Sequence, residues 1–166
     1  MLQVFPDIAD HIWNAKYRYK DEKSIDETFR RVAKGLAETK EDCKDFEEIM
    51  IKRRFCPAGR ILSTVGTQRK NATSANCFAM PQPLDSMDDI MDCLKNSAMT
   101  SRSGGGIGIN FDLLRPHGEI IKGVESYASG PVSFMAMWIT MCKTIASYGM
   151  RRGAMLFTLN YAHPDI

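Results

Sequence analysis

The chain has 166 residues, of which 44% are hydrophobic and 25% charged, and its formal net charge is +2. This length allows one sizeable core, or a small helical module joined to part of a larger domain. Acidic and basic residues are mixed along the chain, no signal peptide is apparent, and the longest apolar stretch, 131–142, is too short to span a bilayer. We therefore expect a soluble cytoplasmic protein that binds neither nucleic acid nor membrane.

The first part of the chain is predicted to be helical. Residues 1–23 show no clean period, but a capping box formed by Ser24 and Glu27 precedes apolar residues at helical spacing. A second amphipathic segment ends before Pro57, and a polar stretch follows it. We predict two helices and then an irregular loop, over residues 24–38, 41–53 and 60–75.

The second part shows strands that alternate with helices. Short apolar runs predict the strands, and helices are expected to begin at the Ser86 cap and at the pair Gly130-Pro131. The predicted strands cover residues 76–80, 107–111 and 154–161, and the predicted helices cover residues 86–102 and 131–148. The first of these helices is expected to bury an apolar face made of Met87, Ile90, Met91, Leu94 and Ala98. This order indicates an α/β fold with parallel strands, covered on both faces and too few to close a sheet.

The cysteines give little direct guidance. They are five, widely spaced and without a CxxC pair, namely Cys43, Cys56, Cys77, Cys93 and Cys142. This favours neither a zinc site nor a disulfide scaffold, and no metal site is predicted. Most of them are expected to be free thiols packed as small hydrophobic side chains, and burial statistics alone make Cys77 a core residue.

Each remaining motif has two readings when it is taken alone. The glycine cluster 104–108 is neither a P-loop nor a dinucleotide fingerprint, so it is a tight turn or a place where a ligand approaches the backbone. Asp85 and Ser86 could bind a ribose hydroxyl or cap a helix, and Arg115 could hold an anion or lie in a solvated turn.

The order of these motifs is more specific than any one of them. The blocks are residues 76–78, 85–87, 103–110, 114–118, 128–135, 151–155 and 163–166. This series resembles the ribonucleotide reductase large-subunit family, and the earlier segments 12–18, 29–33 and 57–62 resemble its class II, adenosylcobalamin-dependent members. The resemblance implies a helical domain, residues 1–72, followed by the first part of a ten-stranded α/β barrel, residues 73–166.

The resemblance also implies a reaction and its residues. In this family the ribose 2′-hydroxyl of a ribonucleotide is replaced by hydrogen through a thiyl radical, and two cysteines become a disulfide. Cys77 matches one of this redox pair, and Asn76, Gly105 and Gly106 match residues that lie against the substrate. Asp85, Ser86 and Met87 match the segment that binds a deoxynucleoside triphosphate or ATP effector, with Arg115 and Lys122 as phosphate partners.

Other expectations concern what lies outside this chain. The family's radical cysteine, second redox cysteine and most adenosylcobalamin contacts match no residue here. We therefore expect a split or truncated gene whose product joins a C-terminal part of the reductase and is reduced by a thioredoxin-like protein. Helices 86–102 and 131–148 match those that form a dimer interface in dimeric members, so a homodimer is one interpretation and an intramolecular core is an equal one. An iron- or manganese-dependent radical source stays open, as does a non-catalytic effector-binding or assembly module.

Overall fold

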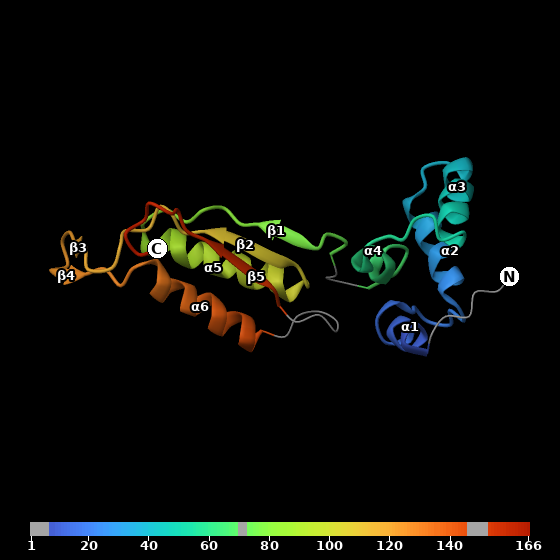
Figure 1. Cartoon of the computed structure of the whole chain (residues 1–166), viewed down its shortest axis with the longest axis horizontal. Helices are drawn as coiled ribbons and strands as arrows, with labels where there is room; N and C mark the ends of the chain where they lie inside the picture. Colours follow the sequence, from blue (N-terminus) through green and yellow to red (C-terminus); the bar gives the residue numbers. More distant parts are fainter. Residues whose placement is uncertain (1–6, 70–72, 146–152) are drawn as a thin grey trace. The chain divides into compact units, whose positions relative to one another are not determined.

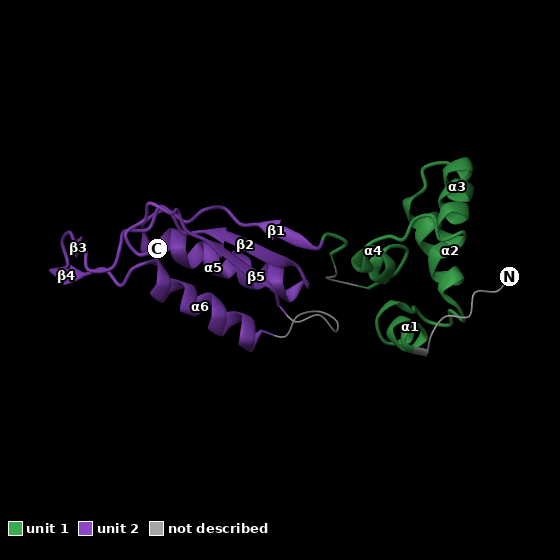
Figure 2. Ribbon diagram, in the orientation of Figure 1, with its two compact units in different colours: residues 1–75 green, residues 76–166 purple. Residues whose placement is uncertain are grey.

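The computed structural model describes residues 7–69, 73–145 and 153–166 and divides the chain into two compact units, Met1–Ala75 and Asn76–Ile166 (Figure 2). Unit 1 is helical and unit 2 is an α/β unit with parallel strands, so the fold class expected from the sequence is confirmed. Arg151 and Arg152, which begin the sequence block 151–155, lie outside the described residues.

Unit 1 consists of short helices (Figure 1). They enclose a small apolar core. They are α1 (Asp7–Ile12), the π-helical turn η1 (Trp13–Tyr17), α2 (Ile25–Leu36), α3 (Lys40–Ile51) and α4 (Gly59–Thr64). The buried core residues come from α2, α3 and α4, and they are Phe29, Val32, Ala33, Met50 and Leu62. The two predicted helices are therefore present, α2 ending two residues earlier than expected and α3 beginning one residue earlier.

Two local predictions in unit 1 are wrong. Ser24 precedes α2, but its side chain makes no capping hydrogen bond, and the Glu27 carboxylate accepts from the Lys23 backbone N–H at 2.8 Å instead. A capping box forms at α3, where Thr39 and Asp42 bond reciprocally. The expected loop 60–75 begins with helix α4, because contacts from α2 hold a segment that has no side-chain cap of its own.

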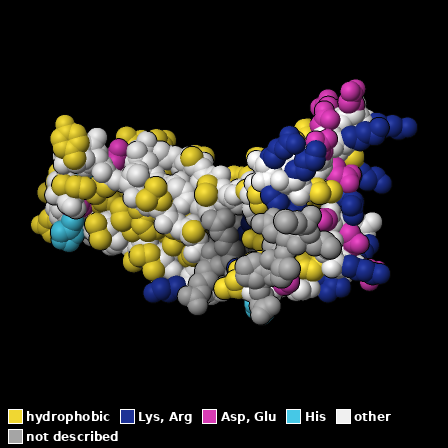
Figure 3. Space-filling model, turned by 45° about the vertical axis from the view of Figure 1, so that its right-hand side comes forward, with side chains coloured by type: hydrophobic (Ala, Val, Ile, Leu, Met, Phe, Trp, Pro, Cys, Tyr) yellow, Lys and Arg dark blue, Asp and Glu magenta, His cyan; other side chains and the backbone are white. Residues whose placement is uncertain are grey.

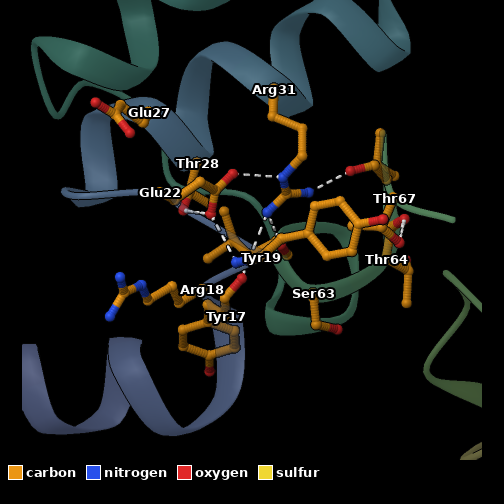
Figure 4. A network of polar contacts seen from close by, with 12 residues as sticks. Tyr17, Arg18, Tyr19, Glu22, Glu27, Thr28, Arg31, Ser63, Thr64 and Thr67 are labelled. Atoms are coloured by element: carbon orange, nitrogen blue, oxygen red, sulfur yellow. Dashed lines mark hydrogen bonds and ion pairs between the residues drawn. The ribbon is translucent and has the colours of Figure 1, made fainter. Parts of the chain in front are cut away.

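Those contacts belong to a largely buried polar network around Arg31, a residue of α2 (Figure 4). The Arg31 guanidinium donates to Oε1 of Glu22 at 2.6 Å and to the carbonyl oxygens of Leu62 and Val65 at the end of α4. The other carboxylate oxygen of Glu22 accepts from Oγ1 of Thr28 at 2.7 Å. Burial opposes ionisation of Glu22, but the bonds from Arg31, Thr28 and the Tyr19 backbone outweigh it and lower the Glu22 pKa.

Unit 2 is built on a three-stranded parallel sheet with strand order β1-β2-β5 (Figure 1). The strands are β1 (Cys77–Ala79), β2 (Gly106–Asn110) and β5 (Met155–Thr158). Two helices connect them, α5 (Met87–Arg102) and α6 (Pro131–Thr144), and a small antiparallel hairpin, β3 (Ile120–Ile121) with β4 (Ser126–Tyr127), precedes α6. The sequence did not predict this hairpin, since strands of two residues leave no period.

The core of unit 2 lies between one face of the sheet and the two helices. Because side chains alternate along a strand, Ile107 and Ile109 point to the same face of β2, and Phe111 continues the row. The ring of Phe111 meets that of Trp138 edge-on at 5.2 Å between centroids. Trp138 is fully buried and donates from Nε1 to Oγ of Ser97 at 2.9 Å.

The face of α5 that packs in this core differs from the predicted one. Ile90 is buried as expected, but Met87 and Met91 are 57% and 39% exposed. Ser97 and Ser101 are buried in their place. Leu94 packs against this core as expected, so the predicted face is partly confirmed. The buried side of α5 also includes Cys93, and Ser97 there accepts a hydrogen bond from Nε1 of Trp138.

The second face of the sheet is open in the described part of the chain, which corrects the expectation that both faces are covered. Apart from Leu156, its residues are small or polar, namely Cys77, Ala79, Gly106, Gly108, Asn110 and Thr158. Leu156 is 65% exposed, and the side chain of Cys77 is exposed as well, so the prediction that Cys77 is a core residue is wrong.

Surface character differs between the units. Figure 3 shows charged side chains gathered over the helices of unit 1 and hydrophobic side chains prominent over unit 2. In the described residues no helix is both long enough and apolar enough to cross a membrane.

Candidate functional site

Cys77 lies at the amino end of the open sheet face, directly beside Gly106. The two residues are register partners in the parallel pair β1–β2, and the Gly106 backbone N–H donates to the carbonyl oxygen of Asn76 at 2.7 Å. A Cβ atom placed on Gly106 would lie 3.6 Å from Sγ of Cys77. The glycine therefore keeps a side chain out of the position next to the thiol. The Gly106 backbone is itself buried, so Cys77 is the exposed member of the pair.

Gly105 has a different role from its neighbour. A Cβ on Gly105 would lie 2.6 Å from Cε2 of Phe78 and 3.0 Å from Cγ2 of Thr100, on the side of the sheet that faces α5. This glycine is required by internal packing. The sequence grouped Gly105 and Gly106 as one ligand-facing pair, whereas the structure separates them onto opposite faces.

The other cysteines contrast with Cys77. All five are free thiols, and Cys93 is buried in the core of unit 2, where its Sγ–H donates to the carbonyl oxygen of Pro81. Burial raises the pKa of the Cys93 thiol, and the bond to Ser97 offsets this only in part. Cys56 is the other exposed thiol, and it lies in unit 1.

The predicted effector residues lie after the carboxyl ends of β1 and β2. Ser86 is the N-cap of α5, and its Oγ accepts from the Asp89 backbone N–H at 3.2 Å. Asp85 accepts from Nε of Arg115 at 2.6 Å and more weakly from the Arg115 backbone N–H at 3.4 Å. Ser86 thus has the capping role, and Arg115 is brought to Asp85 across thirty residues of sequence.

The remaining members of the set are exposed. Met87 begins α5 with its side chain in solvent, and Lys122 lies in the turn of the β3–β4 hairpin. None of the ion pairs of the described residues joins Lys122 to Asp85. The structure therefore brings Asp85, Ser86 and Arg115 close together and leaves Lys122 apart from them, in the β3–β4 hairpin.

The thiol and the ion pair occupy opposite ends of one sheet. Cys77 and Gly106 begin their strands, while Asp85 and Arg115 follow the strand ends. β2 has five residues, which span roughly 13 Å. Among the described residues, no group of His, Cys, Asp and Glu could hold a metal ion.

Two residues beyond the predicted set contact the same region. His163 is buried and bonds the carbonyl oxygen of Leu114 at 2.9 Å, and the Asp165 carboxylate accepts from the His117 backbone N–H at 2.9 Å. The sequence placed both in a family block without a role. A histidine shortly after the predicted strand 154–161 was the only signal in the sequence, and it did not reveal the partner forty-nine residues away.

The chain therefore has a helical unit followed by an α/β unit of parallel strands, with an exposed thiol on the face of the first strand that α5 and α6 leave open. Residues 75–166 match the family described as ribonucleotide reductase, barrel domain, and residues 4–70 match ribonucleotide reductase, all-alpha domain. The chain belongs to the ribonucleotide reductase large-subunit family, and the resemblance drawn from its sequence blocks is confirmed.

Named relatives agree with this assignment. A vitamin B12-dependent ribonucleoside-diphosphate reductase of Thermoplasma acidophilum is 42% identical over 73% of this chain and 15% of its own length. The ribonucleoside-diphosphate reductase subunit alpha of Bacillus subtilis is 31% identical over 90% of this chain and 20% of its own length. The solved Actinobacillus ureae class Id ribonucleotide reductase alpha subunit shares the fold, with a TM-score of 0.81 and 22% identity over 97% of this chain and 29% of that chain. The chain thus spans less than a third of each of these proteins.

Proposed function

We propose that the chain is part of a ribonucleotide reductase that converts ribonucleotides to deoxyribonucleotides, and that Cys77 is one of its two redox cysteines. In the overall reaction the substrate loses its 2′-hydroxyl as water and gains a hydrogen at that carbon. Two thiols supply the two electrons and two protons, and they end as a disulfide. Cys77 supplies one thiol, and a cysteine outside this chain supplies the other.

The observation that carries this proposal is the pairing of Cys77 with Gly106 on the open sheet face. A thiol that reduces a ligand must be accessible to it. Cys77 is exposed, and residue 106 places no Cβ atom beside its Sγ. We assign Asn76, Cys77 and Gly106 to the ribose side of the substrate, with Gly105 supporting them from behind.

The far end of the sheet is proposed as the specificity-effector site. Arg115 offers a guanidinium for a deoxynucleoside triphosphate or ATP, and Asp85 orients it through Nε. Ser86 and Met87 open the adjacent helix, whose N-terminus favours negative charge. Lys122 would join the triphosphate from the hairpin arm.

The cofactor and partners follow from the relatives. Adenosylcobalamin, the cofactor implied by the vitamin B12-dependent relatives, would supply the radical that starts the reaction and would be held mainly by residues outside this chain. The partners we propose are the C-terminal part of the reductase, a thioredoxin-like reductant, and a second copy that meets α5 and α6. The exposed Met87, Met91 and Val132 on these helices suit such a contact.

The test is reconstitution of the chain with a polypeptide that carries the rest of a class II large subunit. Deoxyribonucleotide formation is measured with adenosylcobalamin and a dithiol for the unchanged chain, Cys77→Ser and Cys56→Ser. A serine hydroxyl cannot enter a disulfide, so Cys77→Ser should lose dithiol-supported turnover, while the exposed Cys56 should tolerate the change. Full turnover by Cys77→Ser would overturn the proposed role, and turnover by the chain alone would contradict the need for a partner.

A further inference from the structure

The segment 118–128, which lies between β2 and α6 and carries the β3–β4 hairpin, forms an arm whose two ends lie side by side. The Gly118 backbone N–H donates to the carbonyl oxygen of Ala128 at 2.9 Å, and the Ala128 N–H donates to the carbonyl oxygen of Glu119 at 2.7 Å. These two bonds close the base of the arm that carries the β3–β4 hairpin. Arg115 lies just before this base and Lys122 lies in the hairpin turn.

His163, which follows β5, holds one side of this base in a defined tautomer. The Asp165 backbone N–H lies 3.1 Å from Nδ1 of His163, so Nδ1 accepts and carries no proton. The proton is therefore on Nε2, which donates to the carbonyl oxygen of Leu114 at 2.9 Å. Both ring nitrogens of this buried imidazole are thus engaged in hydrogen bonds to the backbone.

Asp165 holds the other side of the base of the arm. Its Oδ2 accepts from the His117 backbone N–H at 2.9 Å. Gly130, at the start of α6, has a φ of +79°, and a Cβ there would lie 2.5 Å from that same Oδ2 and 2.9 Å from the His117 nitrogen. The two ends of the arm and the segment after β5 therefore meet around one carboxylate, with no room for a further side chain.

Arg115 lies between these two attachments. Leu114 is fixed through its carbonyl oxygen and His117 through its N–H, while the N–H and Nε of Arg115 both point to Asp85. We propose that His163 and Asp165 are positioning residues that fix the base of the arm and so hold Arg115 against Asp85 for anion binding. This inference rests on the effector site proposed above, and it adds that the segment after β5 sets the geometry of that site.

The test uses the full chain and matched variants. Asp165→Asn keeps an oxygen that can accept from His117, whereas Asp165→Ala removes it. His163→Gln keeps a donor near the Nε2 position, whereas His163→Ala removes both bonds. His117→Ala is the control, because His117 contributes its backbone N–H to this contact and its side chain is exposed.

Two readouts separate positioning from general loss of structure. Amide hydrogen exchange at Arg115 and His117 should speed up roughly three- to tenfold in Asp165→Ala and His163→Ala, and should be largely restored in Asp165→Asn. Exchange in the centre of β2 should stay unchanged. The affinity for dTTP, used as the probe, should fall by a similar factor in the two alanine variants and stay unchanged in His117→Ala.

The outcomes distinguish the two proposals. If dTTP fails to bind the unchanged chain while amide exchange responds as expected, His163 and Asp165 still fix the base of the arm. In that case the effector assignment for this chain fails. If Asp165→Ala leaves exchange at Arg115 and His117 unchanged, or lowers dTTP affinity no more than Asp165→Asn does, the positioning role is overturned. A nitrogen-15 spectrum in which Nδ1 of His163 carries the proton would also contradict it.

Discussion

Adjacent glycines at the start of β2 should respond in opposite ways to the same substitution. Gly105→Ala would place a methyl group 2.6 Å from the Phe78 ring, and overpacking of this kind costs about 1–3 kcal/mol. Gly106→Ala would place a methyl 3.4 Å from the nearest atom, the Asn76 carbonyl oxygen, which is ordinary contact. Neither residue has a positive φ, so the change at Gly106 should alter the free energy of unfolding by less than about 1 kcal/mol.

Gly106→Ala, the variant expected to keep its stability, should be the one that loses activity. The Gly106→Ala methyl would occupy the space beside Sγ of Cys77, so turnover in the reconstituted enzyme should be lost although the protein stays folded. Stability is measured by urea unfolding, with Trp138 fluorescence reporting on unit 2 in a Trp13→Phe background. The reasoning would be refuted if Gly106→Ala destabilised unit 2 as much as Gly105→Ala, or if it turned over normally.

Further predictions concern charge. Because the Glu22 pKa is lowered in the folded chain, its stabilising contribution is present above the ordinary value of 4.5 and disappears as the pH falls through the lower folded value. Glu22→Gln should therefore reduce the acid sensitivity of unit 1 in thermal unfolding between pH 3 and 7, and an unchanged pH profile would exclude this role. Arg115→Ala should weaken dTTP binding about ten- to hundredfold by calorimetry, because it removes a cation and exposes the Asp85 carboxylate to the triphosphate. The double variant Arg115→Ala/Asp85→Ala should recover part of that loss. If Arg115→Ala left the affinity unchanged, Arg115 would have only a structural role as the ion-pair partner of Asp85.

Much of the fold could be predicted because it follows from local periodicity. Helices α2, α3, α5 and α6 have apolar spacing or start signals that act within a few residues. Helix α4 was missed because Arg31, thirty-one residues before Leu62, supplies its hydrogen-bond partners. A tertiary contact of this kind leaves no trace in the local pattern.

The site was predicted less completely for the same reason. Family blocks pointed to Cys77 as a candidate, but burial statistics placed it in a core, since they assume a sheet covered on both faces. Asp85 and Arg115 were assigned to one site, although nothing in the sequence indicated that they bond each other. His163 and Asp165 depend on backbone partners in a distant loop, which no side-chain pattern records.

The central claim is that Cys77 gives up its thiol hydrogen and becomes part of a disulfide during turnover. The most direct measurement is a reaction of the pre-reduced, reconstituted enzyme without external reductant, followed by mass spectrometry of alkylated peptides. The account predicts one disulfide that contains Cys77 for each deoxyribonucleotide formed, with Cys56 still alkylated as a free thiol. Product formed in stoichiometric amount while Cys77 remains a free thiol would contradict it.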